Sequence, residues 1–70
     1  MDILAERLRK LRKERKLSRR AVAQATGMAE RTYQRYEKAE REPDATSLRL
    51  LADFYGVSAD YLLGRTEGPG

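Results

Sequence analysis

Residues 17–37 read LSRRAVAQATGMAERTYQRYE, a stretch whose residue types predict two short helices joined by a tight turn. Ser18 is a good N-cap, and Gly27 suits the left-handed residue that often follows a helix, so the first helix should span residues 19–26. Two tyrosines three positions apart then share one face of a second helix, which we expect over about residues 30–39.

The flanking sequence predicts three more helices and no strands. Leucines four and three positions apart form an apolar stripe over a helix from residue 3 to about residue 16. A second stripe follows Asp44 or Thr46, either of which can cap a helix that ends at Gly56. Ser58 then begins a short fifth helix. We therefore expect an all-α fold, a compact bundle of five helices.

Seventy residues suit one small domain, which we place at residues 1–64, followed by a flexible tail or linker at residues 65–70. The chain has no cysteine and no histidine, which excludes disulfides, thiolate nucleophiles and the commonest metal ligands. We expect no cofactor, no metal and no enzymatic activity. No apolar run is long enough to span a membrane and the start has no signal-peptide layout, so we expect a cytoplasmic protein.

The charge balance favours an anionic partner. The chain has 15 Lys and Arg against 11 Asp and Glu, a net charge of +4. Residues 1–20 hold nine of the basic residues and three of the acidic ones, so the excess positive charge lies at one end of the sequence. One face of the protein could therefore meet a polyanion while another stays free.

Residues 3–64 resemble the Cro/cI-like (XRE family) helix-turn-helix DNA-binding domain. The residues that match its pattern in register are Leu17-Ser18, Gly27, Thr32, Tyr36-Glu37, Pro43, Leu51-Ala52, Val57-Ser58, Asp60 and Leu62-Leu63. The resemblance implies a lambda-repressor-like bundle in which residues 30–39 form the recognition helix. It also implies a sequence-specific transcriptional regulator, which we expect to be a repressor, that binds double-stranded DNA as a homodimer on a palindromic operator.

The outward face of the recognition helix carries long polar side chains, which can read hydrogen-bonding patterns on base edges in the major groove. The expected base readers are Glu30, Arg31, Gln34 and Arg35. An ordinary solvated helix face is the alternative interpretation, because any exposed helix is polar. Glu30 could instead steer Arg31 or repel a phosphate.

Backbone phosphates are expected to meet a second group of residues. This group is Ser18, Arg19, Arg20, Thr32, Lys38 and Arg41. Arg19 and Arg20 occupy the first turn of a helix, where basic side chains are unfavourable unless an anion docks there. They could also be tolerated surface charges. The family usually has Gln at the position of Arg19, so that glutamine's contact cannot be carried over unchanged.

Other matched positions imply structural roles. By resemblance, Arg12 and Glu37 form an ion pair that orients the recognition helix. By resemblance too, the dimer interface involves Val57, Tyr61 and Leu63, although Tyr61 could simply belong to the core.

Two alanines depart from the family pattern. Ala39 replaces a usual Gly and resists the left-handed conformation, so the third helix should continue for a turn or end under mild strain. Ala29 replaces a usual Ser or Thr cap, which lowers helix stability by about 1 kcal/mol.

Two other classes of function stay open. One is an antitoxin-like or other protein-binding regulatory module in which DNA binding is secondary. The other is a module for a membrane surface, suggested by the basic first helix, although its leucines are needed for the core and we expect no membrane partner. A further C-terminal domain or a protein partner could also supply association or sense a signal.

Overall fold

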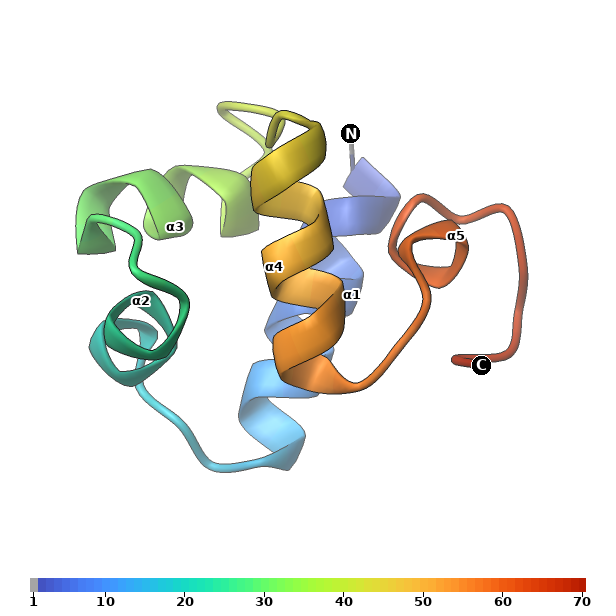
Figure 1. Ribbon diagram of the computed structural model, residues 1–70, viewed down its shortest axis with the longest axis horizontal. Coiled ribbons are helices and arrows are strands. Elements are labelled where there is room, and N and C mark those ends of the chain that lie inside the picture. Colours follow the sequence, from blue (N-terminus) through green and yellow to red (C-terminus); the bar gives the residue numbers. More distant parts are fainter. Residues whose placement is uncertain (1) are drawn as a thin grey trace.

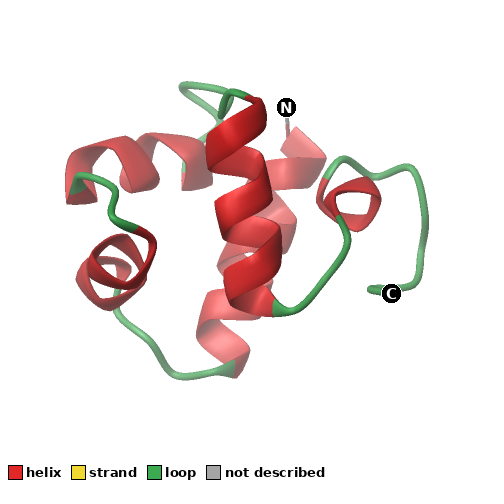
Figure 2. Ribbon diagram, in the orientation of Figure 1, coloured by secondary structure: helices red, strands yellow, loops and turns green. Residues whose placement is uncertain are grey.

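A computed structural model describes residues 2–70, which form five helices joined by loops and contain no strand (Figures 1 and 2). The helices are α1 (Asp2–Glu14), α2 (Arg19–Thr26), α3 (Glu30–Glu37), α4 (Ala45–Tyr55) and α5 (Ala59–Leu62). In Figure 1, α4 lies in front of α1, α2 and α3 lie on one side of this pair, and α5 lies on the other. The predicted all-α fold of five helices is confirmed.

Side chains just before three of the helices cap their free N–H groups. Ser18 Oγ accepts from the backbone N–H of Ala21 at 3.0 Å, and Ser58 Oγ accepts from Tyr61 at the same distance. Asp44, rather than Thr46, caps α4 by accepting from the N–H of Ser47. Ala29 offers no side-chain cap to α3. These short-range contacts determine where α2, α4 and α5 begin.

All five helices end in the same way, with one residue in the left-handed conformation and a backbone bond across the last turn. The left-handed residues are Lys16, Gly27, Ala39, Gly56 and Gly64. In each case the following N–H donates to the carbonyl five positions earlier, at 2.9 to 3.1 Å. α1 therefore ends before residue 16, and α3 ends at Glu37 rather than 39. Ala39, with φ of 59°, has the strained conformation that was one of its two expected outcomes.

The core lies where the five helices meet. Its buried side chains include Leu4, Leu8, Leu11, Val22, Ala23, Tyr33, Tyr36, Leu51, Ala52, Tyr55, Tyr61 and Leu62. The hydroxyls of Tyr33 and Tyr55 lie 2.7 Å apart inside it, so each buried hydroxyl has a partner. Because α3 packs against both α1 and α2, its inner face is held on two sides.

Tyr61 lies in the core, the alternative that the sequence left open for it, and its part in a dimer contact stays a prediction. Its side chain is only 7% exposed. The Arg7 guanidinium covers the ring, with its carbon 4.2 Å from the ring centre. Tyr61 and Leu62 are the two buried residues through which the short helix α5 packs onto the core. Val57 and Leu63 are half-buried.

Residues 63–70 form turns and loop that fold back onto the helices. The N–H of Ser58 donates to the Pro69 carbonyl at 2.8 Å, and Arg7 Nη1 donates to the Thr66 carbonyl at 2.8 Å. The segment expected as a tail thus contacts both α5 and α1. None of the helices within residues 2–70 combines the length and the apolar character needed to cross a membrane.

Candidate nucleic-acid interface

The outer face of α3 presents the four expected base readers at the surface. Glu30 and Arg31 are exposed, and Gln34 and Arg35 are half-buried. Tyr33 and Tyr36 lie on the opposite face of the helix and point into the core, where they are at most 3% exposed. None of the four side chains forms a hydrogen bond or ion pair with another residue of the described chain. The buried tyrosines therefore hold α3 in place, and its outer face is open to a ligand.

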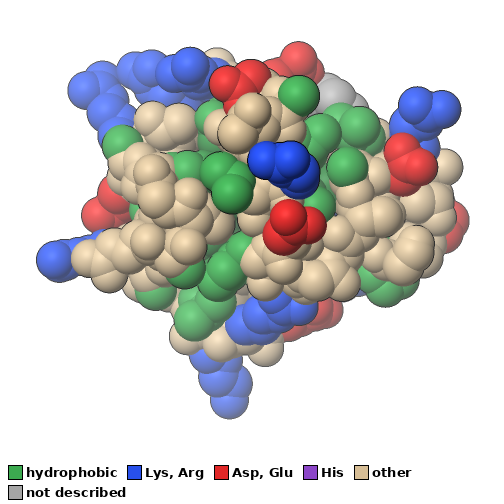
Figure 3. Space-filling model, in the orientation of Figure 1, with side chains coloured by type: hydrophobic (Ala, Val, Ile, Leu, Met, Phe, Trp, Pro, Cys, Tyr) green, Lys and Arg blue, Asp and Glu red, His purple; other side chains and the backbone are tan. Residues whose placement is uncertain are grey.

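The expected phosphate residues surround the same pair of helices. Ser18 and Arg20 are exposed and Arg19 is partly exposed, all at the start of α2. Thr32 is half-buried on α3, whereas Lys38 and Arg41 are exposed just after it. Figure 3 shows Lys and Arg side chains gathered at the edge of the molecule over α3. Positive charge therefore accompanies the polar face of α3.

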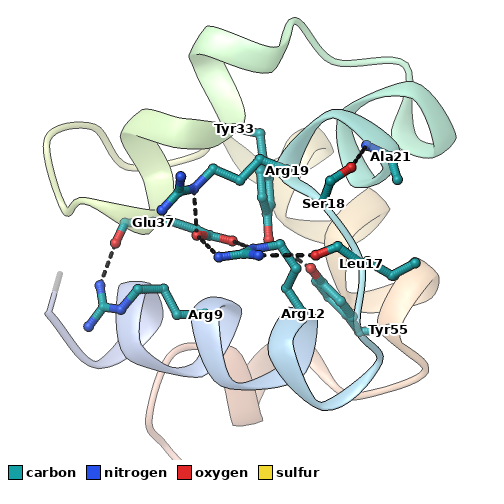
Figure 4. Close-up of polar contacts among 9 residues, drawn as sticks. All are labelled: Arg9, Arg12, Leu17, Ser18, Arg19, Ala21, Tyr33, Glu37 and Tyr55. Carbon is teal, nitrogen blue, oxygen red and sulfur yellow. Dashed lines mark hydrogen bonds and ion pairs between the residues drawn. The ribbon is translucent and has the colours of Figure 1, made fainter.

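Glu37 lies at the centre of an ion-pair network that joins three helices (Figure 4). Its side chain is completely buried. Oε2 accepts from Arg12 Nε at 2.6 Å, and Oε1 accepts from Arg12 Nη2 at 3.1 Å. Arg12 also donates from Nη1 to the Leu17 carbonyl at 3.0 Å. This two-pronged contact fixes the position of α3 relative to α1.

Arg19 is the second arginine of this network, a role that the sequence did not reveal. Its Nε donates to Glu37 Oε1 at 3.1 Å, so the first turn of α2 is joined to the last turn of α3. The unusual arginine at this position was visible in the sequence, but its partner was not, because the two residues lie 18 positions apart.

The electrostatics of the network keep Glu37 ionised. Burial by itself would raise the pKa of Glu37, but hydrogen bonds from Arg12, Tyr33 and Arg19 outweigh burial and lower it. The hydrogen bond to Glu37 raises the pKa of Arg12 above its usual value. Burial, together with hydrogen bonds to Glu37 and Tyr55, raises the pKa of Tyr33, which therefore remains a neutral hydroxyl. Glu37 therefore stays negatively charged between the guanidinium groups of Arg12 and Arg19.

Arg7 and Arg9 of α1, and Arg15 just after it, donate hydrogen bonds to backbone carbonyls of other helices. Arg9 donates to the Glu37 carbonyl, Arg7 to the Tyr61 carbonyl, and Arg15 to the Tyr55 carbonyl at 2.5 Å. These carbonyls lie at the ends of α3, α5 and α4, where helices carry partial negative charge. The sequence suggested that this basic region faces a polyanion. In the structure Arg7, Arg9 and Arg15 bond these carbonyls, partners that only the fold reveals, and contact of this region with a polyanion stays a prediction.

Most of this chain, including all of α2, α3 and α4, is similar to known proteins. Residues 8–62 match the family model described as Helix-turn-helix. The chain is 42% identical over 64 residues to an uncharacterized HTH-type transcriptional regulator, YobD of Bacillus subtilis (strain 168), covering 91% of this chain and 57% of the relative. It is 40% identical over 62 residues to the HTH-type transcriptional regulator AnsR of the same organism, covering 89% and 53%.

A third relative is the cryptic phage CTXphi transcriptional repressor RstR of Vibrio cholerae. It is 35% identical over 65 residues, covering 93% of this chain and 59% of the relative. The chain thus spans little more than half the length of these three relatives. No solved structure matched the chain.

Proposed function

This chain belongs to the XRE-type helix-turn-helix family, and on that premise we propose that it is a sequence-specific DNA-binding regulator of transcription acting in the cytoplasm. A repressor is the form of regulation we favour, because one similar protein is named a phage transcriptional repressor. The observation that carries the proposal is the polar outer face of α3, whose four base-reading candidates have no internal partner while its inner face is buried.

In this proposal α3 enters the major groove. Arg31 and Arg35 can each donate two hydrogen bonds to the O6 and N7 atoms of guanine, and Gln34 can pair with adenine. Glu30 can accept from the amino group of cytosine. The buried tyrosines and the Glu37 network prevent the helix from rotating, so these side chains keep one register relative to the bases.

Contacts to the DNA backbone would then come from residues beside the base readers. We assign this role to Ser18, Arg19, Arg20, Thr32, Lys38 and Arg41. Ser18 Oγ already accepts a bond from the backbone, but its hydroxyl proton is free to donate to a phosphate oxygen. Such contacts orient the domain and add affinity on any sequence.

A homodimer on a palindromic operator extends the proposal, because one recognition helix reads too few base pairs for useful specificity. Val57 and Leu63 are the two expected interface residues that remain partly accessible. A larger protein containing this domain could carry further association surfaces, given the length of the relatives.

Selection of binding sites from a random duplex pool tests the function directly. We expect an enriched palindromic sequence, and no enrichment would instead favour a protein-binding module. On the selected duplex, Arg31→Ala and Gln34→Ala should each lose about 1 to 3 kcal/mol of discrimination at particular base positions. Arg65→Ala is the matched control, since it removes an exposed charge beyond α5, and it should leave the base preference unchanged.

A further inference from the structure

Two arginines share one buried carboxylate, and they share it unequally. Arg12 makes three hydrogen bonds, two of them to Glu37, and its side chain is only 12% exposed. Arg19 makes one bond, from Nε, and its side chain is 39% exposed. Two positive charges therefore face one negative charge, and the unbalanced charge lies on the more exposed arginine.

The terminal nitrogens of Arg19 have no internal partner. A guanidinium has five N–H donors, and the single bond to Glu37 leaves the four on Nη1 and Nη2 unused by any residue of the described chain. In Figure 4 the Nε edge of Arg19 faces the carboxylate, and the terminal nitrogens point away from it. Two parallel N–H groups on one planar group match the spacing of two phosphate oxygens.

We propose that Glu37 is a positioning residue for DNA binding, holding Arg19 by Nε so that both terminal nitrogens donate to one backbone phosphate. The proposal rests on the proposed function and assigns a new part of its mechanism. Free arginine side chains lose much conformational freedom when they bind. Arg19 is ordered before DNA arrives, because its partner carboxylate is buried and already held by Arg12.

Arg20 provides an internal comparison. It is the next residue in α2, it is exposed, and it forms no ion pair or side-chain hydrogen bond with the described residues. Both arginines carry the same charge near the same helix end. Only Arg19 has the carboxylate behind it, so the two positions separate the effect of ordering from the effect of charge.

The test uses lysine and alanine at both positions, with affinity measured on the selected duplex at several salt concentrations. Arg19→Lys keeps the charge, but an ammonium group lacks the planar set of donors that bonds Glu37 on one edge and a phosphate on the other. It should therefore weaken binding about tenfold. Arg20→Lys keeps the charge of a residue that we also assign to a phosphate, but it breaks no bond to Glu37, so it should weaken binding clearly less than Arg19→Lys does. Arg19→Ala should reduce the log–log salt slope by about 0.9, the value for one phosphate.

The role of Glu37 is tested by a double-variant cycle. In a Glu37→Gln background, Arg19→Lys should have no larger effect than Arg20→Lys. Should Glu37→Gln fail to fold, NMR of the unmodified free protein decides, because a bond to a buried carboxylate slows exchange of the Arg19 Nε proton with water. Exchange as slow as that of Arg12 supports the proposal, and exchange as fast as that of Arg20 overturns it.

Different outcomes show whether the positioning role of Glu37 or DNA binding itself is wrong. If the unmodified protein binds its duplex but Arg19→Lys and Arg20→Lys lose equal affinity, the positioning role is wrong and DNA binding stands. If Arg19→Ala lowers the melting temperature without changing the salt slope, the residue is only structural and the phosphate contact is wrong. If the unmodified protein selects no duplex and binds none, the proposed function itself is wrong.

Discussion

Ala39 shows how a helix can end without the residue that best suits its last position. Three of the five helices end on a left-handed glycine, whereas Lys16 and Ala39 take the same conformation with a side chain in place. An L-residue with a Cβ pays roughly 1 to 2 kcal/mol of steric energy there. The backbone bond from the Glu40 N–H to the Arg35 carbonyl, at 3.0 Å, helps to hold Ala39 in that conformation.

Replacing Ala39 with glycine should therefore stabilise the protein. Glycine removes the steric penalty but gains freedom in the unfolded chain, so we expect a net gain of about 0.5 to 1 kcal/mol in the free energy of unfolding. Urea denaturation measures it. Ala25→Gly is the matched control, because Ala25 is exposed within α2 and the same change should cost about 1 kcal/mol there. Equal losses at both positions would contradict the strain at Ala39.

α1 is a scaffold helix whose cations complete the other helices. Its Arg9 and Arg7 bond the carbonyl ends of α3 and α5, Arg15 just beyond it bonds that of α4, and its leucines supply one side of the core. The neighbouring Lys10 and Lys13 are exposed and have no side-chain bond to the described residues. Arginine and lysine are thus divided between two tasks on one helix, because the guanidinium has several donors in a planar arrangement and the ammonium is strongly hydrated.

Adjacent positions on α1 can test this division. Methionine keeps a long side chain and a good helix propensity but cannot donate a hydrogen bond. Arg9→Met should lower the free energy of unfolding by about 1 kcal/mol, because it removes a charged donor from the end of α3. Lys10→Met should change it by less than about 0.5 kcal/mol. Thermal and urea unfolding of both variants give the comparison, and similar values would argue against helix-end contacts by Arg9.

The whole molecule depends on one ionised carboxylate, because Glu37 joins α1, α2 and α3 from a fully buried position. A buried carboxylate with its partners removed would be very unfavourable, and so would the partners without it. The same network that orients α3 therefore couples stability to pH. Its contacts bring together residues up to 25 positions apart, so it forms only in the assembled fold.

Acid should unfold the protein through Glu37. Its pKa is lower in the folded protein than in the unfolded chain. Between these two pKa values the folded state therefore binds fewer protons than the unfolded state. The stabilisation is complete above the usual glutamate pKa and is lost as the pH falls through the lower folded value. We expect the free energy of unfolding to decrease between about pH 6 and about pH 3.

Asp44 provides the control for this experiment. The hydrogen bond from the Ser47 N–H lowers the pKa of Asp44 too, but the side chain is exposed. Asparagine caps a helix as well as aspartate does. Asp44→Asn should therefore keep most of the acid sensitivity in urea titrations at each pH. If Asp44→Asn abolishes that sensitivity, Glu37 is not its source.

The helices were predictable because their signals are local. Ser18 and Gly27 mark the ends of α2 within a few residues, and apolar spacing alone places Tyr33 and Tyr36 inside. The polar outer face of α3 followed from the same spacing. The pair of Arg12 and Glu37 was expected only by family resemblance, because no local pattern connects residues on separate helices.

Packing decided what each charged or aromatic side chain does. The sequence shows a basic first helix, but only the assembled bundle brings carbonyl ends within reach of Arg7, Arg9 and Arg15. It likewise places Tyr61 in the core and the Arg19 Nε beside Glu37. The physical reason is range: capping and helical periodicity act within a turn or two of chain, whereas ion pairs and burial depend on distances that exist only after distant segments have packed together.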